Sequence, residues 1–165
     1  MNKSKIKSMK LYNNVSRIFN ELKEVGKDKS KLLKVEDLIK FDQLHYCGTD
    51  AVDFAIINTK INSSKSILEI GSGIGGPARY IGYKTRASVT ALELQEDQHK
   101  IAVDLTNKCK LLKFVNHIRG DILNYNWKNK KFNVVVSWLA LYHIKDHSKL
   151  LKNCYKLIKE NGYFF

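Results

Sequence analysis

The chain has 165 residues, 44% of them hydrophobic, and a formal net charge of +13, so it has apolar material for one compact core and fits a single domain better than two. The positive charge is spread along the chain, and lysine greatly outnumbers arginine, the residue better suited to bidentate phosphate recognition, which makes nucleic acid an unlikely partner. No apolar run approaches the roughly 20 residues of a membrane span, and the first residues lack the apolar stretch of a secretory signal, so we expect a cytoplasmic protein without a membrane partner.

The first 40 residues are predicted to form a basic helical extension. Residues 1–10 are polar and rich in lysine, and apolar residues then recur at helical spacing from Val15 to Val25, before Gly26. A second apolar cluster covers 32–39, and "FDQLHYCG" at 41–48 is expected to be an irregular connector. After it, Thr49 or Asp50 is expected to cap another helix.

Residues 41–165 are predicted to form one α/β domain. Short β-type runs, at 66–70, 88–94, 115–121 and 132–138, alternate with segments of helical periodicity, including 98–112. This alternation predicts a Rossmann-like, doubly wound and mainly parallel sheet, with the apolar runs 67–70 and 133–137 at its centre. A last helix, expected to begin at Ser148 and end at Asn161-Gly162, precedes a fifth strand, "GYFF".

Glycine is concentrated in "ILEIGSGIGGPARY" at 67–80. Gly71, Gly73 and Gly76 follow an apolar strand, and Pro77 then opens a helix, so the segment has the literal pattern GxGxxG. Such a turn brings backbone N–H groups close to a nucleotide-like ligand. The pattern alone is weak, and a tight turn that binds nothing is the alternative.

Three carboxylates lie beside this loop or at later strand ends. Glu69 precedes the first glycine, Glu93 ends the second strand, where it could accept both hydroxyls of a ribose, and Asp121 ends the third, where it could receive an adenine amino group. All three are expected at the carboxyl edge of the sheet, where open α/β sheets bind ligands. Taken singly, Glu93 and Asp121 could equally be helix caps.

These segments resemble the class I S-adenosylmethionine-dependent methyltransferases. "LEIGSGIGGPARY" is similar to their motif I, "ALELQ" and "GDIL" to the ends of their second and third strands, and "VVVSWLALYHI" to the segment bordering the active site. "FDQLHYCGTDA" resembles the segment before motif I in sarcosine/dimethylglycine and phosphoethanolamine methyltransferases, where it helps cover the cofactor; His45 is a further candidate there. The resemblance implies S-adenosylmethionine as cofactor, held by Gln43, Tyr46, Glu69, Gly71, Ser72, Gly73, Gly75, Glu93, Leu94, Asp121, Ile122 and Ser137.

The resemblance implies methyl transfer to a small-molecule acceptor through an oxygen or nitrogen nucleophile. His143 is the candidate general base, although it could equally pack in the core. His143 and His147 are four residues apart, but no third ligand is evident and the three cysteines form no CxxC pair, so no metal is expected. "SWLA" stands where many methyltransferases of nucleobases and protein amides have Asn-Pro-Pro-Tyr, which favours a small acceptor.

The family sheet has seven strands, and this chain ends within the fifth. Three alternatives follow: the chain is a fragment of a longer product, its sheet edge is completed by a second chain or copy, or it is a shortened member of the family. Two other functions therefore stay open: a non-catalytic protein that binds the cofactor or a partner, and an NAD-dependent oxidoreductase, which the literal GxGxxG also fits.

Overall fold

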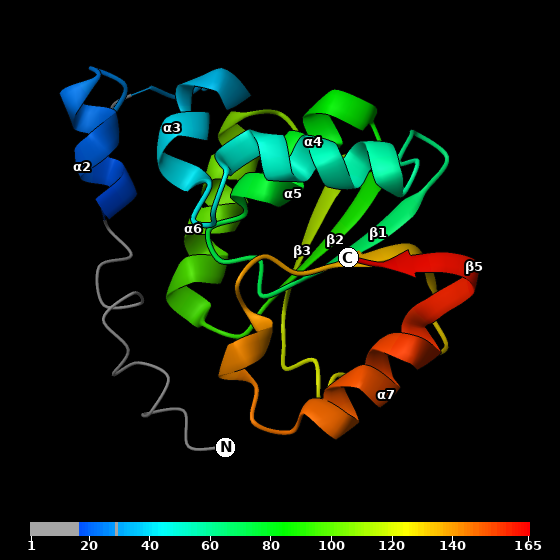
Figure 1. Ribbon diagram of the computed structural model, residues 1–165. Helices are drawn as coiled ribbons and strands as arrows, with labels where there is room; N and C mark the ends of the chain where they lie inside the picture. The colour runs from blue at the N-terminus through cyan, green and yellow to red at the C-terminus, as the bar shows by residue number, and fades with distance from the viewer. Residues whose placement is uncertain (1–16, 29) are drawn as a thin grey trace.

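Five parallel strands form one sheet in the order β3-β2-β1-β4-β5. The structure, a computed structural model, describes residues 17–28 and 30–165 (Figure 1). The strands are β1 (Ser66–Ile70), β2 (Ser88–Glu93), β3 (Val115–Arg119), β4 (Phe132–Val136) and β5 (Ile158–Phe164). The helices are α2 (Arg17–Glu24), α3 (Ile39–Asp42), α4 (Gly48–Asn58), α5 (Gly76–Thr85), α6 (Glu96–Lys108) and α7 (His147–Leu157), with 3₁₀ turns at Val35–Asp37 and Leu141–His143.

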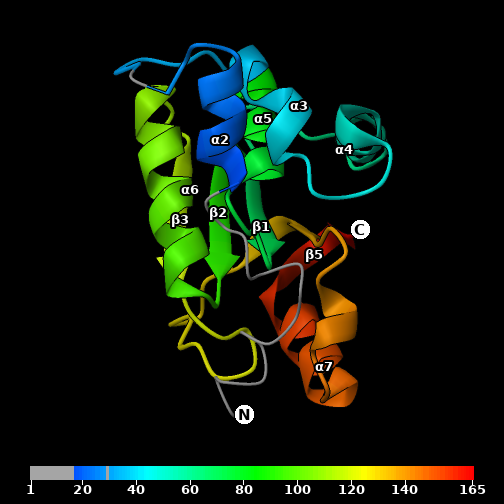
Figure 2. The ribbon, with the colours of Figure 1, turned by 90° about the vertical axis from the view of Figure 1, so that its left-hand side faces the viewer.

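Helices cover both faces of the sheet, as the alternation of strands and helices predicts. Alternate residues of β1 face opposite ways: Ile67 packs in a cluster with Val52 of α4 and Ala78 of α5. Leu68 packs in a second cluster with Leu150 of α7. Figure 2 shows α7 on the opposite side of the sheet from α4, α5 and α6. The Rossmann-like α/β fold is therefore confirmed, with β1 at the centre and β4 beside it.

The N-terminal helices pack on the α6 side of the domain. Ile18 and Leu22 of α2 and Leu38 share one buried cluster with Leu105 of α6. The predicted helix is observed over Arg17–Glu24, while the basic arm 1–10 and residues 15–16 lie outside the described residues. The division of the chain at residue 40 stays a prediction. Within the described residues, no helix combines the length and apolar character needed to cross a bilayer.

The end of the last helix was predicted wrongly. α7 ends at Leu157, and β5 begins at Ile158, well before Asn161-Gly162. Ile158 pairs with Phe132 and Tyr163 with Val134, so 159–162 bulge opposite Asn133 alone, with Asn161 at a φ of 56°. Because pairing with β4 gives Ile158 its backbone partners, the Asn-Gly signal shapes the bulge instead of ending the helix.

Other helix boundaries also differ from the prediction. α4 begins after Cys47, which has a φ of 60° and makes no side-chain cap, so neither Thr49 nor Asp50 starts it. α7 is capped by Asp146, whose carboxylate accepts a hydrogen bond from the Lys149 N–H at 2.9 Å, and not by Ser148. α6 covers 96–108 instead of 98–112, and the expected connector 41–48 contributes residues to both α3 and α4.

Phe132 is a test of the core on the α7 side of the sheet. Its side chain has no exposed surface and meets the Trp127 ring edge-on at 5.6 Å. Phe132→Ala is expected to lower the free energy of unfolding by about 3–5 kcal/mol in urea titrations, because it removes a large buried ring and leaves a cavity. Tyr155→Ala, which truncates an aromatic ring that is 83% exposed, is the control. Equal losses in the two variants would contradict this packing.

Candidate functional site

The glycine loop connects β1 to α5 and is hydrogen-bonded to the carboxyl end of β2. The N–H groups of Gly71 and Ser72 both donate to the Leu92 carbonyl of β2, at 2.9 and 3.0 Å. Gly71 has a φ of 71°, and a Cβ on it would overlap the Ala140 Cβ. The loop after β4 therefore lies directly on the loop after β1, and only glycine fits at this crossing.

Two hollows open on either side of this crossing. The small hollow, of about 100 Å³, lies between the ends of β1, β2 and β3 and the 3₁₀ turn at 141–143. The large hollow, of about 620 Å³, lies between the glycine loop and segments 41–46 and 138–142. Gly71, Gly73 and Ala140 line both hollows, so these residues stand where the two spaces meet.

Most of the predicted site residues line these two hollows. The large hollow is lined by Gln43, Tyr46, Glu69, Gly71, Ser72 and Gly73, and also by His45. The small hollow is lined by Gly71, Gly73, Glu93, Leu94, Asp121, Ile122 and His143.

Gly75 and Ser137 are not among the residues that line either hollow. Gly75 precedes α5 with a φ of 80°, and a Cβ there would come within 2.8 Å of the His117 ring. The Ser137 hydroxyl donates to the Ile70 carbonyl at 2.9 Å. In this structure, Gly75 therefore fits the helix against β3 and Ser137 ties β4 to β1.

Glu93 and Asp121 accept hydrogen bonds from neighbouring groups while also facing the small hollow; neither caps a helix, since the N-cap of α6 is Gln95 and no helix is described between β3 and β4. The Glu93 carboxylate accepts hydrogen bonds from the N–H groups of Gly73 and Gln95, both at 2.8 Å. Asp121 accepts from the Leu123 N–H and the Asn124 amide, both at 2.9 Å. Each carboxylate oxygen has a second lone pair, so these hydrogen bonds leave capacity for a ligand. Burial raises the pKa of Glu93, and its bonds with the backbone N–H groups of Gln95 and Gly73 oppose that shift.

Glu69 is the most unusual ionisable group in the site. It is 1% exposed, and its Oε2, like the Ser72 hydroxyl, hydrogen-bonds to none of the described residues. Burial raises the pKa of Glu69 to about 8; Arg79 opposes the shift and Glu93 adds to it. A buried carboxyl oxygen without a hydrogen-bond partner is costly, so this position suits a ligand that brings a positive charge and N–H donors.

His143 lies beside the small hollow and away from the large one. Its ring centroid is 3.8 Å from that of Tyr142, and burial lowers its pKa, which favours the neutral imidazole. Its role as a general base stays a prediction. Across residues 17–28 and 30–165, no group of three or more His, Cys, Asp or Glu side chains is placed to hold a metal ion.

Sequence reasoning missed a buried ion pair behind the site. The Arg79 guanidinium has no exposed surface and lies 3.0 Å from the Asp42 carboxylate, also buried. Its Nη1 donates to the Ile74 carbonyl at 2.7 Å and to the Thr106 hydroxyl at 3.3 Å. Burial raises the pKa of Asp42, and the charge of Arg79 opposes that shift. The sequence feature that could have indicated this pair is an arginine among the buried, apolar residues of α5, which include Ala78 and Ile81.

Comparison with known proteins identifies the family. Residues 68–165 match a family model described as "Methyltransferase domain". The chain belongs to this family. Sterol 24-C-methyltransferase of Debaryomyces hansenii is 29% identical over 105 residues, which are 64% of this chain and 28% of that protein. Phosphoethanolamine N-methyltransferase of Plasmodium falciparum is 26% identical over 118 residues, 70% of this chain and 43% of that protein.

Solved structures share the fold of this methyltransferase domain. A putative S-adenosyl-L-methionine-dependent methyltransferase from Methanococcus maripaludis aligns with a TM-score of 0.70 and 16% identity, over 91% of this chain and 60% of that one. A putative sarcosine dimethylglycine methyltransferase from Galdieria sulphuraria aligns with a TM-score of 0.64 and 22% identity, over 68% of this chain and 42% of its own. The chain thus spans less than half the length of the two methyltransferases compared by sequence.

The residues present fit S-adenosylmethionine, the cofactor of this family. Its amino acid part carries an ammonium group, which matches the buried carboxyl of Glu69 in the large hollow, whose Oε2 hydrogen-bonds to none of the described residues. Its nucleoside part offers hydroxyl and amino donors, which match the acceptor oxygens of Glu93 and Asp121 in the small hollow. The crossing of Gly71 and Ala140 lies between the two.

The buried pair gives a stability prediction. Asp42→Asn is expected to lower the free energy of unfolding by about 3–5 kcal/mol in urea at pH 7, because it leaves the Arg79 charge buried without its partner. The matched control is Asp53→Asn, which breaks the more exposed pair with Lys84 at 2.6 Å and is expected to cost about 1 kcal/mol or less. An Asp42→Asn loss no larger than that of the control would contradict the assignment.

Glu69 gives a prediction about protons. With a pKa raised to about 8, Glu69 is largely protonated at pH 7 and must lose its proton to pair with an ammonium group. Binding of S-adenosylhomocysteine is therefore expected to release close to one proton at pH 7 and to tighten as pH rises from 6.5 to 8. Calorimetry in two buffers of different ionisation enthalpy measures the release. Glu69→Gln should abolish it, and an unchanged release in that variant would count against this role.

Proposed function

We propose that this chain binds S-adenosylmethionine across the two hollows and transfers its methyl group to a small molecule held in the large hollow. The observation that carries the proposal is the junction at Gly71 and Ala140. It has the acceptor carboxylates of Glu93 and Asp121 on its small-hollow side and the buried Oε2 of Glu69, without a partner among the described residues, on the other. Names of the relatives, which include sterol and phosphoethanolamine methyltransferases, support a small-molecule acceptor with an oxygen, nitrogen or carbon nucleophile.

In this proposal, the chain positions the reactants and excludes water. Glu93, Leu94, Asp121 and Ile122 hold the nucleoside end, while Glu69, Gly71, Ser72 and Gly73 hold the amino acid end. Gln43 and Tyr46 cover the site from segment 41–46, which the stacked rings of His45 and Trp138, 5.0 Å apart, join to the loop after β4. S-adenosylmethionine supplies a methyl group on a positively charged sulfur, already activated toward nucleophiles, so alignment is the main task left to the protein.

A second candidate is binding without catalysis. Among the described strands, β5 pairs with β4 alone, and Phe164 is 41% exposed. Completion of this edge by another copy or another chain stays a prediction. The family match favours the methyl donor over NAD as the ligand of the glycine loop.

We further place this activity in the cytoplasm. Cys47, Cys109 and Cys154 are free thiols, and burial raises the pKa of both Cys109 and Cys154 to about 11, so these two stay protonated and unreactive. Free thiols suit a reducing compartment.

Calorimetric titration with S-adenosylhomocysteine, S-adenosylmethionine and NAD tests the proposal. Binding of the first two is expected, and Glu93→Ala should weaken it by about 1–3 kcal/mol, because hydrogen bonds to a charged group are lost. Glu96→Ala, which removes a half-exposed carboxylate that pairs with Lys100 and Arg119, is the control and should bind as the parent does.

Binding of NAD alone would overturn the proposal, and unchanged affinity in a folded Glu93→Ala variant would limit Glu93 to its hydrogen bonds with Gly73 and Gln95. Transfer of a labelled methyl group to a panel of sterols, phenols and small amines separates the enzyme from the non-catalytic alternative. Cofactor binding without transfer to any acceptor would favour the second candidate.

A further inference from the structure

The wall of the large hollow opposite the glycine loop is apolar and largely aromatic. Four of its residues are well exposed at the mouth: Leu44 at 53%, Tyr46 at 79%, Leu139 at 42% and Tyr142 at 59%. Side chains this large and apolar, gathered around one opening, are typical of a surface that binds an apolar ligand. The apolar and aromatic residues of this wall are Ile18, Phe41, Leu44, Tyr46, Trp138, Leu139 and Tyr142.

The polar side chains of the same wall bond to one another. The Gln43 amide donates to the Asp42 carboxylate at 2.9 Å, and the amide oxygen of Gln43 lies 3.2 Å from the His45 Nε2. The other ring nitrogen of His45 lies 3.0 Å from the Tyr46 carbonyl. These groups thus have partners before any acceptor arrives, whereas the buried Trp138 Nε1–H has none among the described residues. The rest of the surface left for an acceptor is mostly apolar.

The charged side chains of the wall are paired in the same way. Arg17 lies 3.1 Å from the Glu21 carboxylate, and Asp42 is neutralised by Arg79. Glu69 is the remaining acidic side chain among the described residues lining the hollow, and the proposed function assigns it to the cofactor. Aromatic faces also attract ammonium ions, but among the described residues of this wall no carboxylate is left to strengthen the binding of a cationic acceptor.

We propose that the methyl acceptor is an uncharged, mainly apolar molecule whose body packs against Leu44, Tyr46, Trp138 and Tyr142. The inference rests on the proposed function and narrows its substrate class. A small charged amine would leave the aromatic wall in water, whereas a ring system or chain covers the exposed side chains at the mouth. The large hollow, of about 620 Å³, is in the size range of pockets for whole small molecules.

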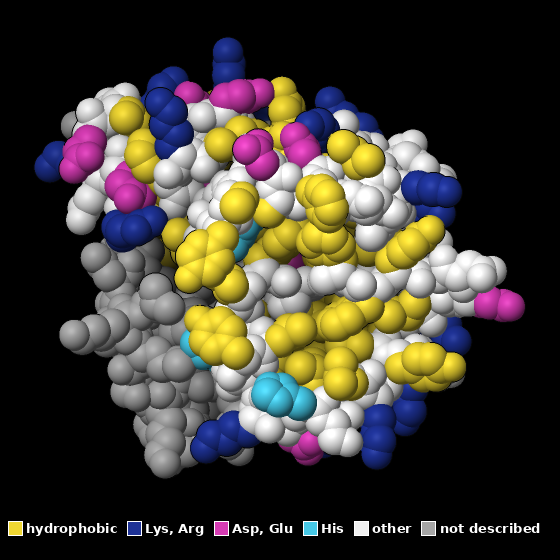
Figure 3. All heavy atoms as spheres, viewed as in Figure 1, with side chains coloured by type: hydrophobic (Ala, Val, Ile, Leu, Met, Phe, Trp, Pro, Cys, Tyr) yellow, Lys and Arg dark blue, Asp and Glu magenta, His cyan; other side chains and the backbone are white. Residues whose placement is uncertain are grey.

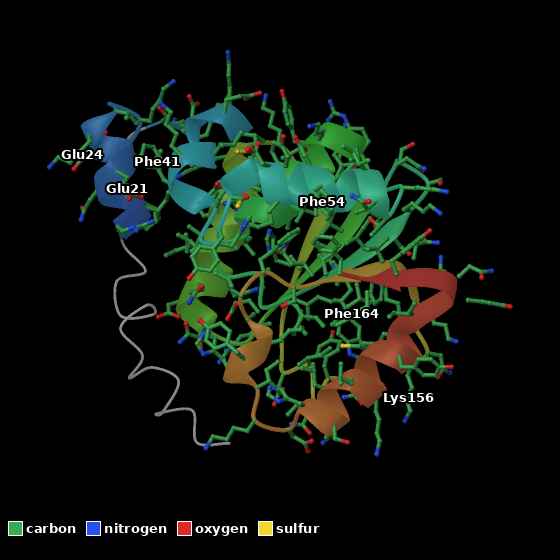
Figure 4. The ribbon with its side chains drawn as sticks, in the orientation of Figure 1. Glu21, Glu24, Phe41, Phe54, Lys156 and Phe164 are labelled. Atoms are coloured by element: carbon green, nitrogen blue, oxygen red, sulfur yellow. The ribbon has the colours of Figure 1, made fainter. Side chains whose placement is uncertain are left out.

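The test has to distinguish binding in the large hollow from binding to a neighbouring apolar face. Ring contacts continue from Trp138 to Phe165 at 5.6 Å and from Phe165 to Phe54 at 6.1 Å. Figure 3 shows apolar side chains gathered on the face between α4 and α7. Phe54 of α4 and Phe164 of β5 lie on this face, as Figure 4 shows, and Phe54 is 60% exposed. An apolar probe could therefore bind beside the large hollow instead of in it.

The test uses N-phenyl-1-naphthylamine, an uncharged fluorophore that brightens in apolar surroundings, with the full chain saturated with S-adenosylhomocysteine. We expect one equivalent to bind, and the double variant Leu44→Ser/Tyr142→Ser to weaken binding about tenfold, because two contact side chains lose apolar surface. Phe54→Ser, which reports on the neighbouring face, and Tyr155→Ser, an exposed tyrosine of α7, should bind as the parent does. 1-Decanol should displace the probe, and choline should not.

Two results would overturn the inference: displacement by choline at concentrations where 1-decanol fails, or a loss of binding in Phe54→Ser but not in the double variant. Calorimetry with S-adenosylhomocysteine on the same variants separates the two proposals. Failure of the parent chain to bind it counts against the proposed function. If S-adenosylhomocysteine binds normally and the probe binds Leu44→Ser/Tyr142→Ser as tightly as the parent, the proposed function stands and the apolar acceptor is contradicted.

Discussion

A guanidinium without exposed surface lies where the glycine loop, α3 and α6 come together. Arg79 bonds to the Ile74 carbonyl in the loop, the Asp42 carboxylate in α3 and the Thr106 hydroxyl in α6. Taking such a charge out of water costs several kcal/mol unless every partner is in place. The glycine loop, α3 and α6 are therefore coupled, because misplacing any one of them removes a partner of this buried charge.

Close backbone contacts add a steric condition to this electrostatic one. A Cβ at Gly76 would overlap the Asp42 carbonyl, just as one at Gly71 would overlap the Ala140 Cβ. The end of α3 thus rests directly on the start of α5, and the loop after β4 rests on the loop after β1. Both walls of the large hollow are set by contacts that leave no room for a side chain, so the hollow depends on two glycines as much as on the residues that line it.

Strands and the glycine loop could be predicted because their signals are local. β1 and β4 are apolar runs, and a glycine cluster between strand and helix predicts the turn wherever the chain goes next. Tertiary contacts decided what was missed. Pairing with β4 draws Ile158 out of the last helix. The resemblance correctly located Ser137 at the end of β4. Its hydroxyl donates to the Ile70 carbonyl and does not line either hollow. The role of Arg79 depends on Asp42, 37 residues earlier, and no local pattern reports such a pairing.

The chain is strongly basic overall, yet burial raises the pKa of three carboxyls at or behind the proposed cofactor site, those of Asp42, Glu69 and Glu93. Asp42 is balanced by Arg79, and Glu93 is held by the N–H groups of Gly73 and Gln95. The charge of Arg79 and a hydrogen bond with the Ala78 backbone offset the burial of Glu69 only in part, and its Oε2 hydrogen-bonds to none of the described residues. A ligand with a positive charge supplies what the fold leaves out there, so binding and stability are linked at this carboxyl. In the proposed function, selectivity for a cationic cofactor follows from the place where the fold buries this acidic group.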